Sequence, residues 1–573
     1  MSKKRALLPF TILILSFTAV AFRLFFLQVW HHAELSERVR RMVSCRVRPE
    51  NPCRGMIFDR EGRVLAMSLK TYTFFADPHM IKNPLGMQTA LRSVDIPLSL
   101  SALRNAGDSS YVPLAKNIDD TAMHKIKGLK LEGTGFESQY QREYPEGRLA
   151  CHLLGLVGKD GSGLEGIELT ANAYLTGEKV KQMRYRDARG REITDKLVDP
   201  EDMRGADVSL TIDRNLQFIA EQEIDRVWKD SRSKNAMVII QDPNSGEILA
   251  LSCRPDYDPG NPSASLKGIR NPAVCDIFEP GSTFKMVTIS GALEDKIVTP
   301  SENIFCENGK YRVMNHTISD HEKKGMLTVA QVMECSSNIG TAKIGQRLGR
   351  ENLYRYIRQF GFFSPTGIDL PGEAKGLLKK PEQWSGLSVP VISFGQEIGV
   401  TALQLINAYS SIANGGTLLE PHIVKEVRSP GGETIYRSDR RAIRRTVSAG
   451  TAETMRDILR GVVERGTGVM AKVPGYTVGG KTGTAQKRDP LTGRYSSSAY
   501  VTSFCGMIPA NKPRLTIYVV IDEPRGDYWA SSLAAPVFSR IAGRAMNYMQ
   551  VPPDNENVRV CKVPSYALLM PAK

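Results

Sequence analysis

Apolar and polar positions divide the first thirty residues from the rest of the chain. An apolar run from Ala6 to Phe22 is interrupted only by threonine, serine and proline, and apolarity resumes after Arg23 as far as Trp30. About 20 apolar residues are enough to span the hydrocarbon core of a bilayer. The basic residues at positions 3–5 favour a cytoplasmic N-terminus. The pattern therefore predicts a cytoplasmic tail at residues 1–5 and a transmembrane anchor at residues 6–29.

A cleaved signal peptide is the alternative interpretation of this segment, because Ala19-Val20-Ala21 has the A-x-A form of a cleavage site. The apolar stretch continues past that site, and Trp30 suits the membrane interface, so the pattern favours a retained anchor. Under either interpretation, everything after His31 is exported.

The next two hundred residues are polar and contain only short strand-like pieces. Residues 56–65 predict a hairpin with its turn around Glu61-Gly62. Residues 207–213 alternate as a strand does, and Asp213 is placed to cap a following helix. We expect a separate domain at residues 30–232.

A second unit begins near Asn235, and strand-like runs stand at both of its ends. The strand candidates are residues 237–240, 248–251, 500–507 and 515–521, and a helix from 534 to 548 closes the unit. Strands from both ends bracket a helical middle, which suits an antiparallel sheet with helices packed on it. We expect an α/β (α+β) fold for a domain at residues 233–550, followed by a C-terminal tail at residues 551–573.

Composition agrees with a globular protein and leaves the partner open. The 573 residues are 41% hydrophobic and 24% charged, which excludes a disordered chain and a polytopic membrane protein. The formal charge of +15 would suit nucleic acid, anionic lipid or an acidic polymer, or simply a basic solvated surface. The nine cysteines show no C-x-x-C pair or zinc spacing, and sequence cannot pair them. Cys335 is expected to be a small buried residue and not a nucleophile.

The segment Ser282-Thr283-Phe284-Lys285 carries the first candidate chemistry. Pro280-Gly281 predicts a turn before an apolar helix, with Ser282 at its start and Lys285 one turn on, along the same face. A serine hydroxyl needs a base, and a lysine can serve if burial lowers its pKa. The S-x-x-K pattern alone is weak, since Ser231 to Lys234 also matches it and a serine here is often only a helix cap.

Two further motifs follow in order. Ser336-Ser337-Asn338 precedes a helix-like run, and Lys481-Thr482-Gly483 follows a glycine pair on a predicted strand. Glycines on a strand let a substrate backbone approach closely. The ordered set S-x-x-K, S-x-N and K-T-G is the signature of penicillin-recognising serine enzymes.

On these motifs the chain resembles a class B penicillin-binding protein, a monofunctional peptidoglycan transpeptidase. The resemblance covers nearly the whole length. Its N-terminal part is carried by the segments at 54–66, 142–147, 152–155, 163–166 and 210–213. The resemblance implies that residues 30–232 form a non-catalytic pedestal that docks partners, and that the rest has the transpeptidase and β-lactamase fold.

The resemblance also implies roles for the motif residues in acyl transfer. Ser282 would attack the carbonyl between the last two D-alanines of a stem peptide, with Lys285 as general base. Ser336 would relay the proton to the leaving D-alanine, and Lys481 would supply a positive field. An amine from a second stem peptide would then resolve the acyl-enzyme.

Further roles concern substrate binding. Asn338 would hold the peptide amide, and the hydroxyls of Thr482 and Thr484 would bind the terminal carboxylate beside Gly483. Backbone N–H groups of Ser282 and Thr484 would form the oxyanion hole. No metal or organic cofactor is required. The implied partners are stem peptides on glycan derived from lipid-linked precursor, β-lactams and the membrane, and not nucleic acid.

Within the family, the approach Phe278-Glu279-Pro280 resembles septal, division-specific members more than the lateral-wall branch. A septal member would work beside a membrane-embedded glycan polymerase and other division proteins, in the bacterial inner membrane, with its catalytic domain periplasmic. The family commonly has glycine where Glu397 stands and proline where Ala402 stands, and these departures leave the lateral-wall branch open.

Three other classes compete. A β-lactamase would need an element that positions deacylating water, and no E-x-x-L-N segment is present. A β-lactam sensor usually has several spans or a cytoplasmic effector, whereas about five residues precede this span. A purely structural scaffold would not need all three motifs.

Overall fold

The computed structural model divides into two compact units that interleave along the chain. It describes residues 3–32, 34–35, 45–50, 52–96, 103, 109, 111–177, 180–186, 192–194, 204–261, 268–489 and 492–555. The smaller unit comprises Met1–Cys53, Lys70–Tyr140 and Gly177–Arg204, and the larger one Arg54–Leu69, Gln141–Thr176 and Gly205–Lys573. No single cut in the chain separates them, so the predicted boundary at residue 232 stays a prediction.

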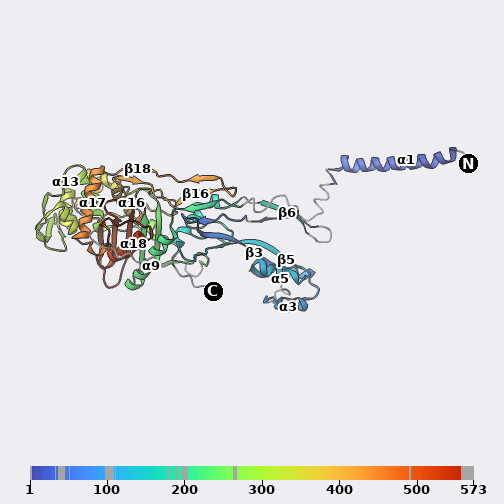
Figure 1. Cartoon of the computed structure of the whole chain (residues 1–573), viewed down its shortest axis with the longest axis horizontal. Coiled ribbons are helices and arrows are strands. Elements are labelled where there is room, and N and C mark those ends of the chain that lie inside the picture. The colour runs from blue at the N-terminus through green and yellow to red at the C-terminus, as the bar shows by residue number, and fades with distance from the viewer. Residues whose placement is uncertain are drawn as a thin grey trace. The chain divides into compact units, whose positions relative to one another are not determined.

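The N-terminal segment forms one long apolar helix. Helix α1 (Lys3–Phe25) continues as a π-helical turn η1 (Phe26–Trp30), and the stretch Pro9–Trp30 is long and apolar enough to cross a membrane (Figure 1). A signal sequence would meet the same test of length and composition. The predicted apolar span is therefore present as a helix.

The remainder of the smaller unit is a small α+β body with its own core. Its elements are β1 (Cys45–Glu50), the C-terminal half of β3 (Val64–Ala76), η2 (Pro78–Met80), α3 (Pro84–Arg92), β4 (Val112–Ile118), α5 (Asp120–Gly128), most of β5 (Thr134–Glu143), β6 (Val180–Arg186) and β7 (Glu192–Thr194). Strands β1, β6 and β7 form one sheet, and β4 pairs with β3. Phe74, Leu91 and Ile126 lie in the buried cluster.

The larger unit is built on a five-stranded antiparallel sheet in the order β10-β9-β21-β20-β19. Its strands are β9 (Asn235–Gln241), β10 (Ile248–Arg254), β19 (Gly479–Arg488), β20 (Tyr495–Ile508) and β21 (Leu515–Asp522). The four predicted strand runs all lie within these strands. Strands β9 and β21, from opposite ends of the second predicted domain, therefore pair with each other, as the sequence pattern indicated.

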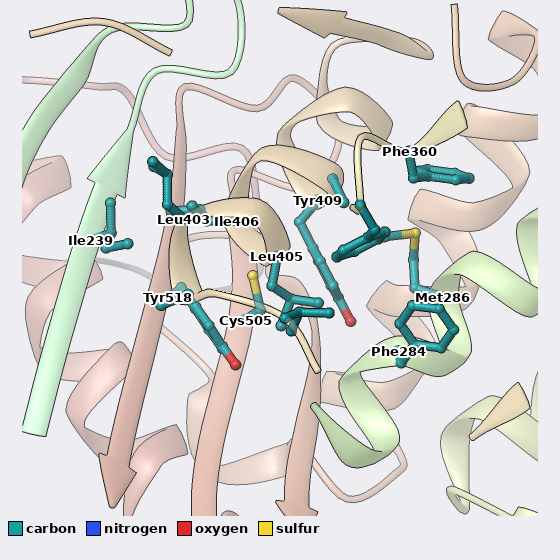
Figure 2. Packing of buried hydrophobic residues seen from close by; sticks show 14 of the residues in the cluster. Ile239, Phe284, Met286, Phe360, Leu403, Leu405, Ile406, Tyr409, Cys505 and Tyr518 are labelled. Atoms are coloured by element: carbon teal, nitrogen blue, oxygen red, sulfur yellow. The ribbon is translucent and has the colours of Figure 1, made fainter. Parts of the chain in front are cut away.

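Helices cover both faces of this sheet. Alternate residues of each strand point to opposite faces, so neighbouring apolar residues of one strand belong to different clusters. Val238 and Ile240 of β9 belong to the cluster of α9 (Arg214–Ser231) and α18 (Ala534–Tyr548). Met237 and Ile239 belong to the cluster on the other face, with α11 (Lys285–Glu294) and α16 (Ala402–Ala413). Figure 2 shows α16 between the sheet and the start of α11.

The larger unit has further elements outside the five-stranded sheet. They are β2 (Ile57–Phe58), α6 (Cys151–Leu154), α7 (Gly166–Thr170), α8 (Asn172–Leu175), β8 (Asp207–Leu210), α10 (Pro272–Cys275), η5 (Gly281–Phe284), β11 (Asn303–Phe305), η6 (Glu307–Gly309), β12 (Lys310–Val313), β13 (His316–Ser319), β14 (Met326–Thr328), α12 (Val329–Glu334), α13 (Asn338–Leu348), α14 (Arg350–Gln359), η7 (Pro381–Gln383), α15 (Ser388–Ser393), β15 (Thr417–Leu419), β16 (Val424–Arg428), β17 (Thr434–Arg437), β18 (Ala442–Arg445), α17 (Ala449–Glu464) and η8 (Val469–Ala471). Four of these strands belong to a second sheet in the order β17-β16-β8-β2.

Local signals in the sequence explain several of these boundaries. Gly62 takes a φ of +83° in the turn between β2 and β3, which confirms the predicted hairpin. The Asp213 carboxylate accepts the backbone N–H groups of Asn215 and Leu216 and so caps α9, as predicted. One prediction is wrong: Cys335 is exposed, because it lies at the C-terminal end of α12 and outside the packed face of that helix.

Candidate active site

Ser282 lies in a tight helical turn that leads directly into α11. The turn η5 is a 3₁₀ segment, and the α-helix proper begins at Lys285, so the serine and lysine are one turn apart as predicted. Lys285 is fully buried and Ser282 is partly exposed. Tyr409 of α16 donates its hydroxyl to the Thr283 carbonyl at 2.8 Å, which ties the turn to the core (Figure 2).

Close backbone approaches around this turn require glycine. Gly395 has a φ of +88°, and a Cβ there would lie 2.1 Å from the Gly281 carbonyl oxygen. The two glycines are also joined by a hydrogen bond from Gly281 N–H to Gly395 O at 3.0 Å. A Cβ on Gly483 would lie 3.0 Å from the Pro280 carbonyl oxygen and 2.9 Å from Thr283 Cγ2. Strand β19 and the loop after α15 can therefore close on the serine turn only without side chains at these points.

The Lys285 ammonium joins the first motif to the second. Its Nζ donates to the Ser336 carbonyl at 2.5 Å, to Asn338 Oδ1 at 2.9 Å and to Ser336 Oγ at 3.2 Å. Ser282 Oγ has no hydrogen-bond partner in the part of the chain that the structure describes. The Ser282 hydroxyl is therefore available to react, and the Lys285 amine is held in place by its hydrogen bonds to Ser336 and Asn338.

Lys481 joins the third motif to the same hydroxyl. Its Nζ donates to Ser336 Oγ at 2.9 Å, to Thr482 Oγ1 at 3.2 Å and to Thr467 Oγ1 at 3.4 Å. Thr467 also shares a hydrogen bond of 2.7 Å with the Thr482 hydroxyl. Thr467 was not identified from the sequence, because it stands in a loop after α17 without any motif around it.

Burial controls the charge of the two lysines. Desolvation lowers the pKa of Lys285 from 10.5 to about 7, although the negative charge of Asp320 opposes this shift. Desolvation, followed by the positive charge of Lys285, lowers the pKa of Lys481 well below its ordinary value. An amine with a pKa near 7 is a competent acceptor for a proton at neutral pH.

The S-x-N segment is held by an acid that sequence reasoning missed. Asp320 accepts the backbone N–H of Asn338 at 2.6 Å and the Ser337 hydroxyl at 2.5 Å. Asn338 is the first residue of α13, and its side-chain amide donates to the Ser319 carbonyl at 3.1 Å. No short motif links Asp320 to the serines, since the contact depends on the β13–β14 loop folding back over the helix.

The remaining predicted residues line strand β19 at the edge of the sheet. Thr482 and Thr484 are two positions apart, so their side chains lie on one face of the strand. Thr484 Oγ1 accepts the Ala530 backbone N–H at 3.4 Å. The structure therefore gathers all three motifs, and among the residues that it describes the Ser336 hydroxyl alone bonds both lysines.

Glu397 occupies a backbone conformation that explains its unusual place in the motif. Its φ is +57°, in the left-handed region that favours glycine. Its backbone N–H donates at 3.1 Å to the carboxylate of Glu279, three residues before Ser282.

Chemically, this arrangement suits attack by a serine hydroxyl on a carbonyl. A buried amine can take the proton, and a second cation can stabilise charge beside the relay hydroxyl. Within the described residues, no group of three His, Cys, Asp or Glu side chains is placed to hold a metal ion.

Comparisons with known proteins agree with this chemistry. Residues 236–543 match the family described as penicillin binding protein transpeptidase domain, and residues 49–210 match the penicillin-binding protein dimerisation domain. Stage V sporulation protein D of Bacillus subtilis is 34% identical over 89% of this chain and 80% of its own length. Peptidoglycan D,D-transpeptidase FtsI of Escherichia coli is 33% identical over 90% of this chain and 86% of its own.

Solved structures give the same result. The crystal structure of penicillin-binding protein 3 from Mycobacterium tuberculosis, complexed with aztreonam, superposes with a TM-score of 0.69 at 30% identity. The match covers 88% of this chain and 98% of that one.

Proposed function

The chain belongs to the class B penicillin-binding proteins and is a serine-type peptidoglycan D,D-transpeptidase, and we propose that Ser282 forms its acyl-enzyme. The observation that carries this proposal is the sharing of the Ser336 hydroxyl by two buried lysine side chains, at 3.2 Å from Lys285 Nζ and 2.9 Å from Lys481 Nζ. Lys285 lies one helical turn after Ser282, and this supports proton transfer between serine, amine and leaving group.

The proposed reaction has two steps. Neutral Lys285 takes the proton as Ser282 Oγ attacks the carbonyl between the two terminal D-alanines. The carbonyl–nitrogen bond breaks, and Ser336 gives its proton to the departing D-alanine amine while it receives the one that Lys285 took. An amine from a second stem peptide then attacks the ester and forms the cross-link. The proton that this amine loses returns through neutral Lys285 to Ser282 Oγ as the ester bond breaks.

Binding roles follow from the position of β19. Hydroxyls of Thr482 and Thr484 would receive the substrate carboxylate beside Lys481. Asn338 would hold the peptide amide, and backbone N–H groups of Ser282 and Thr484 would stabilise the oxyanion.

The roles are tested by acylation kinetics with a fluorescent penicillin. We expect Lys285→Ala to lower the second-order acylation rate by several orders of magnitude, and Ser336→Ala to lower it by about 10²-fold or more. Ser231→Ala is the matched control, because its hydroxyl only bonds the Val227 carbonyl within α9. Wild-type rates in both active-site variants would contradict the proposed roles.

We propose a septal role in cell division. It is supported by the segment Phe278-Glu279-Pro280 before the serine turn, which resembles division-specific members. The anchor helix and the pedestal would contact a membrane-embedded glycan polymerase. Depletion should give filaments with blocked septa, whereas rounded, swollen cells would indicate the lateral-wall branch.

We also propose that the helix over Pro9–Trp30 is a retained single-pass anchor, with the catalytic domain outside the inner membrane. The apolar stretch extends beyond the A-x-A site, which supports retention. An intact N-terminus in the membrane fraction is expected, and mature protein that starts at Phe22 would contradict it.

A further inference from the structure

Asp320 contacts the S-x-N segment more extensively than its place in a loop suggests. It follows β13, and Oδ1 of its carboxylate accepts the backbone N–H groups of Asn338 at 2.6 Å and Ile339 at 3.0 Å. Its Oδ2 accepts the Ser337 hydroxyl at 2.5 Å. The first N–H groups of α13 have no partner within the helix, so a carboxylate at this end provides both a cap and a favourable charge.

The residue two positions before this helix is in an uncommon conformation. Ser336 has a φ of +58°, in the left-handed region that few residues other than glycine adopt. Such a conformation persists only where surrounding contacts determine it. On one side the Lys285 ammonium bonds the Ser336 carbonyl at 2.5 Å. On the other side Asp320 bonds the next three residues.

The position of the Ser336 hydroxyl depends on this turn. Its Oγ lies 3.2 Å from Lys285 Nζ and 2.9 Å from Lys481 Nζ. A displacement of about 1 Å would break at least one of these bonds, and displacements of that size can cost about 10²-fold in rate.

We propose that Asp320 is a positioning residue for the transpeptidation: by capping α13 it holds the Ser336 turn so that the Ser336 hydroxyl stays between the two lysines. The proposal deepens the function proposed for Ser282 and rests on it. Asp320 acts through Ser336 and Asn338, so it is not itself a catalytic residue.

The charge of Asp320 gives the proposal a second, separable readout. Two titratable groups act on the charge of Lys285, namely Asp320 from the β13–β14 loop and Cys306 before η6. The positive charge of Lys285 acts in turn on Lys481 of β19. The Asp320 carboxylate and, more weakly, the Cys306 thiol raise the pKa of Lys285, whereas burial lowers it to about 7. Removing the carboxylate charge should lower the pKa of this amine further.

The experiment measures the acylation rate of the full-length protein by fluorescent penicillin from pH 5.5 to 9, with the adduct mapped to Ser282. Asp320→Ala removes all three hydrogen bonds, and we expect about a 10- to 100-fold slower rate at every pH. Asp320→Asn keeps an oxygen for the two backbone N–H groups. We expect a rate within a few-fold of wild type above pH 8 and an acid limb that moves to lower pH, because neutral Lys285 is then populated at lower pH.

Ser448→Ala is the matched control. Ser448 caps α17 by accepting the Thr451 N–H at 3.3 Å, so its loss lowers stability without touching the motifs. We expect its acylation rate to equal that of wild type.

Wild-type acylation by folded Asp320→Ala would overturn the proposal, and so would an equal loss of rate in Ser448→Ala. If Asp320→Ala does not fold, Asp320→Asn decides, and an unchanged acid limb then refutes the assignment. Failure of the proposed function is a different result, in which the wild-type adduct maps to a residue other than Ser282.

Discussion

Replacing Lys285 by methionine should stabilise the protein near neutral pH although it removes the proposed general base. Lys285 has a side chain with no exposed surface, so its ammonium gives up hydration on folding. Methionine has similar length and is flexible enough to occupy the same space. Functional sites commonly carry such a stability cost.

The magnitude follows from the pKa and the contacts. Burial lowers the pKa of Lys285 from 10.5 to about 7, which at pH 7 corresponds to about 4 kcal/mol lost from the free energy of unfolding. Methionine also forfeits three hydrogen bonds, each with a net value of about 1 kcal/mol. The burial cost that methionine avoids exceeds the hydrogen bonds that it loses, so the free energy of unfolding of the variant should be about 1 kcal/mol higher than that of wild type at pH 7. The pKa of Lys481 should rise at the same time, because the positive charge of Lys285 helps to lower it.

The sign of this effect changes with pH. A lysine whose folded pKa is depressed contributes its full stability above the unfolded pKa of 10.5 and loses it as pH falls towards about 7. The advantage of the variant should therefore be largest at or below pH 7 and shrink by at most about 1.4 kcal/mol per pH unit above it. Near pH 10 the variant should be less stable than wild type, because only the lost hydrogen bonds remain.

Thermal or urea unfolding of both proteins between pH 6 and 10 measures this difference directly. Lys159→Met serves as control, because Lys159 is an exposed residue in a turn and its side chain stays in water on folding. A stability difference between Lys285→Met and wild type that is the same at pH 6.5 and pH 9.5 would refute the reasoning.

Three other predictions concern separate features of the molecule. Gly395→Ala should abolish acylation and lower the melting temperature by several degrees, since its Cβ would lie 2.1 Å from the Gly281 carbonyl oxygen; unchanged melting and labelling would show that the loop can move aside. Glu168→Gln should cost about 3–5 kcal/mol in urea unfolding, because it removes the buried carboxylate charge that Arg54, at 2.5 Å, and Arg142, at 2.6 Å, share; a loss below about 1 kcal/mol would contradict this. The acylation rate of wild type should rise with pH through about 7 as Lys285 loses its proton, and a rate that is flat from pH 5.5 to 9 would exclude that base.

Much of the fold followed from local patterns. The strands β9, β10 and β21 contain uninterrupted apolar runs, because both faces of the sheet are buried. Helix α18 and the cap at Asp213 have strong periodic and capping signals. The interleaving of the two compact units was not predictable, since it depends on contacts between segments far apart in sequence.

The candidate site was predictable only where motifs mark it. Ser282, Lys285 and Lys481 stand in short patterns with a chemical reason for each residue. Asp320 and Thr467 do not, because each reaches the site through a loop whose path depends on tertiary packing. Likewise the left-handed conformations of Ser336 and Glu397 are imposed by their contacts and have no local signal.

The central claim is that Ser282 is the nucleophile, and mass spectrometry of the protein after reaction with a fluorescent penicillin tests it most directly. We expect a single persistent adduct on Ser282, because the ester must survive until an amine arrives. Labelling should be absent in Ser282→Ala, which should remain folded because the serine turn has no side-chain cap hydrogen bond that the substitution could remove. It should be undiminished in Ser231→Ala. A stable adduct on any other residue, or undiminished labelling of Ser282→Ala, would contradict the assignment.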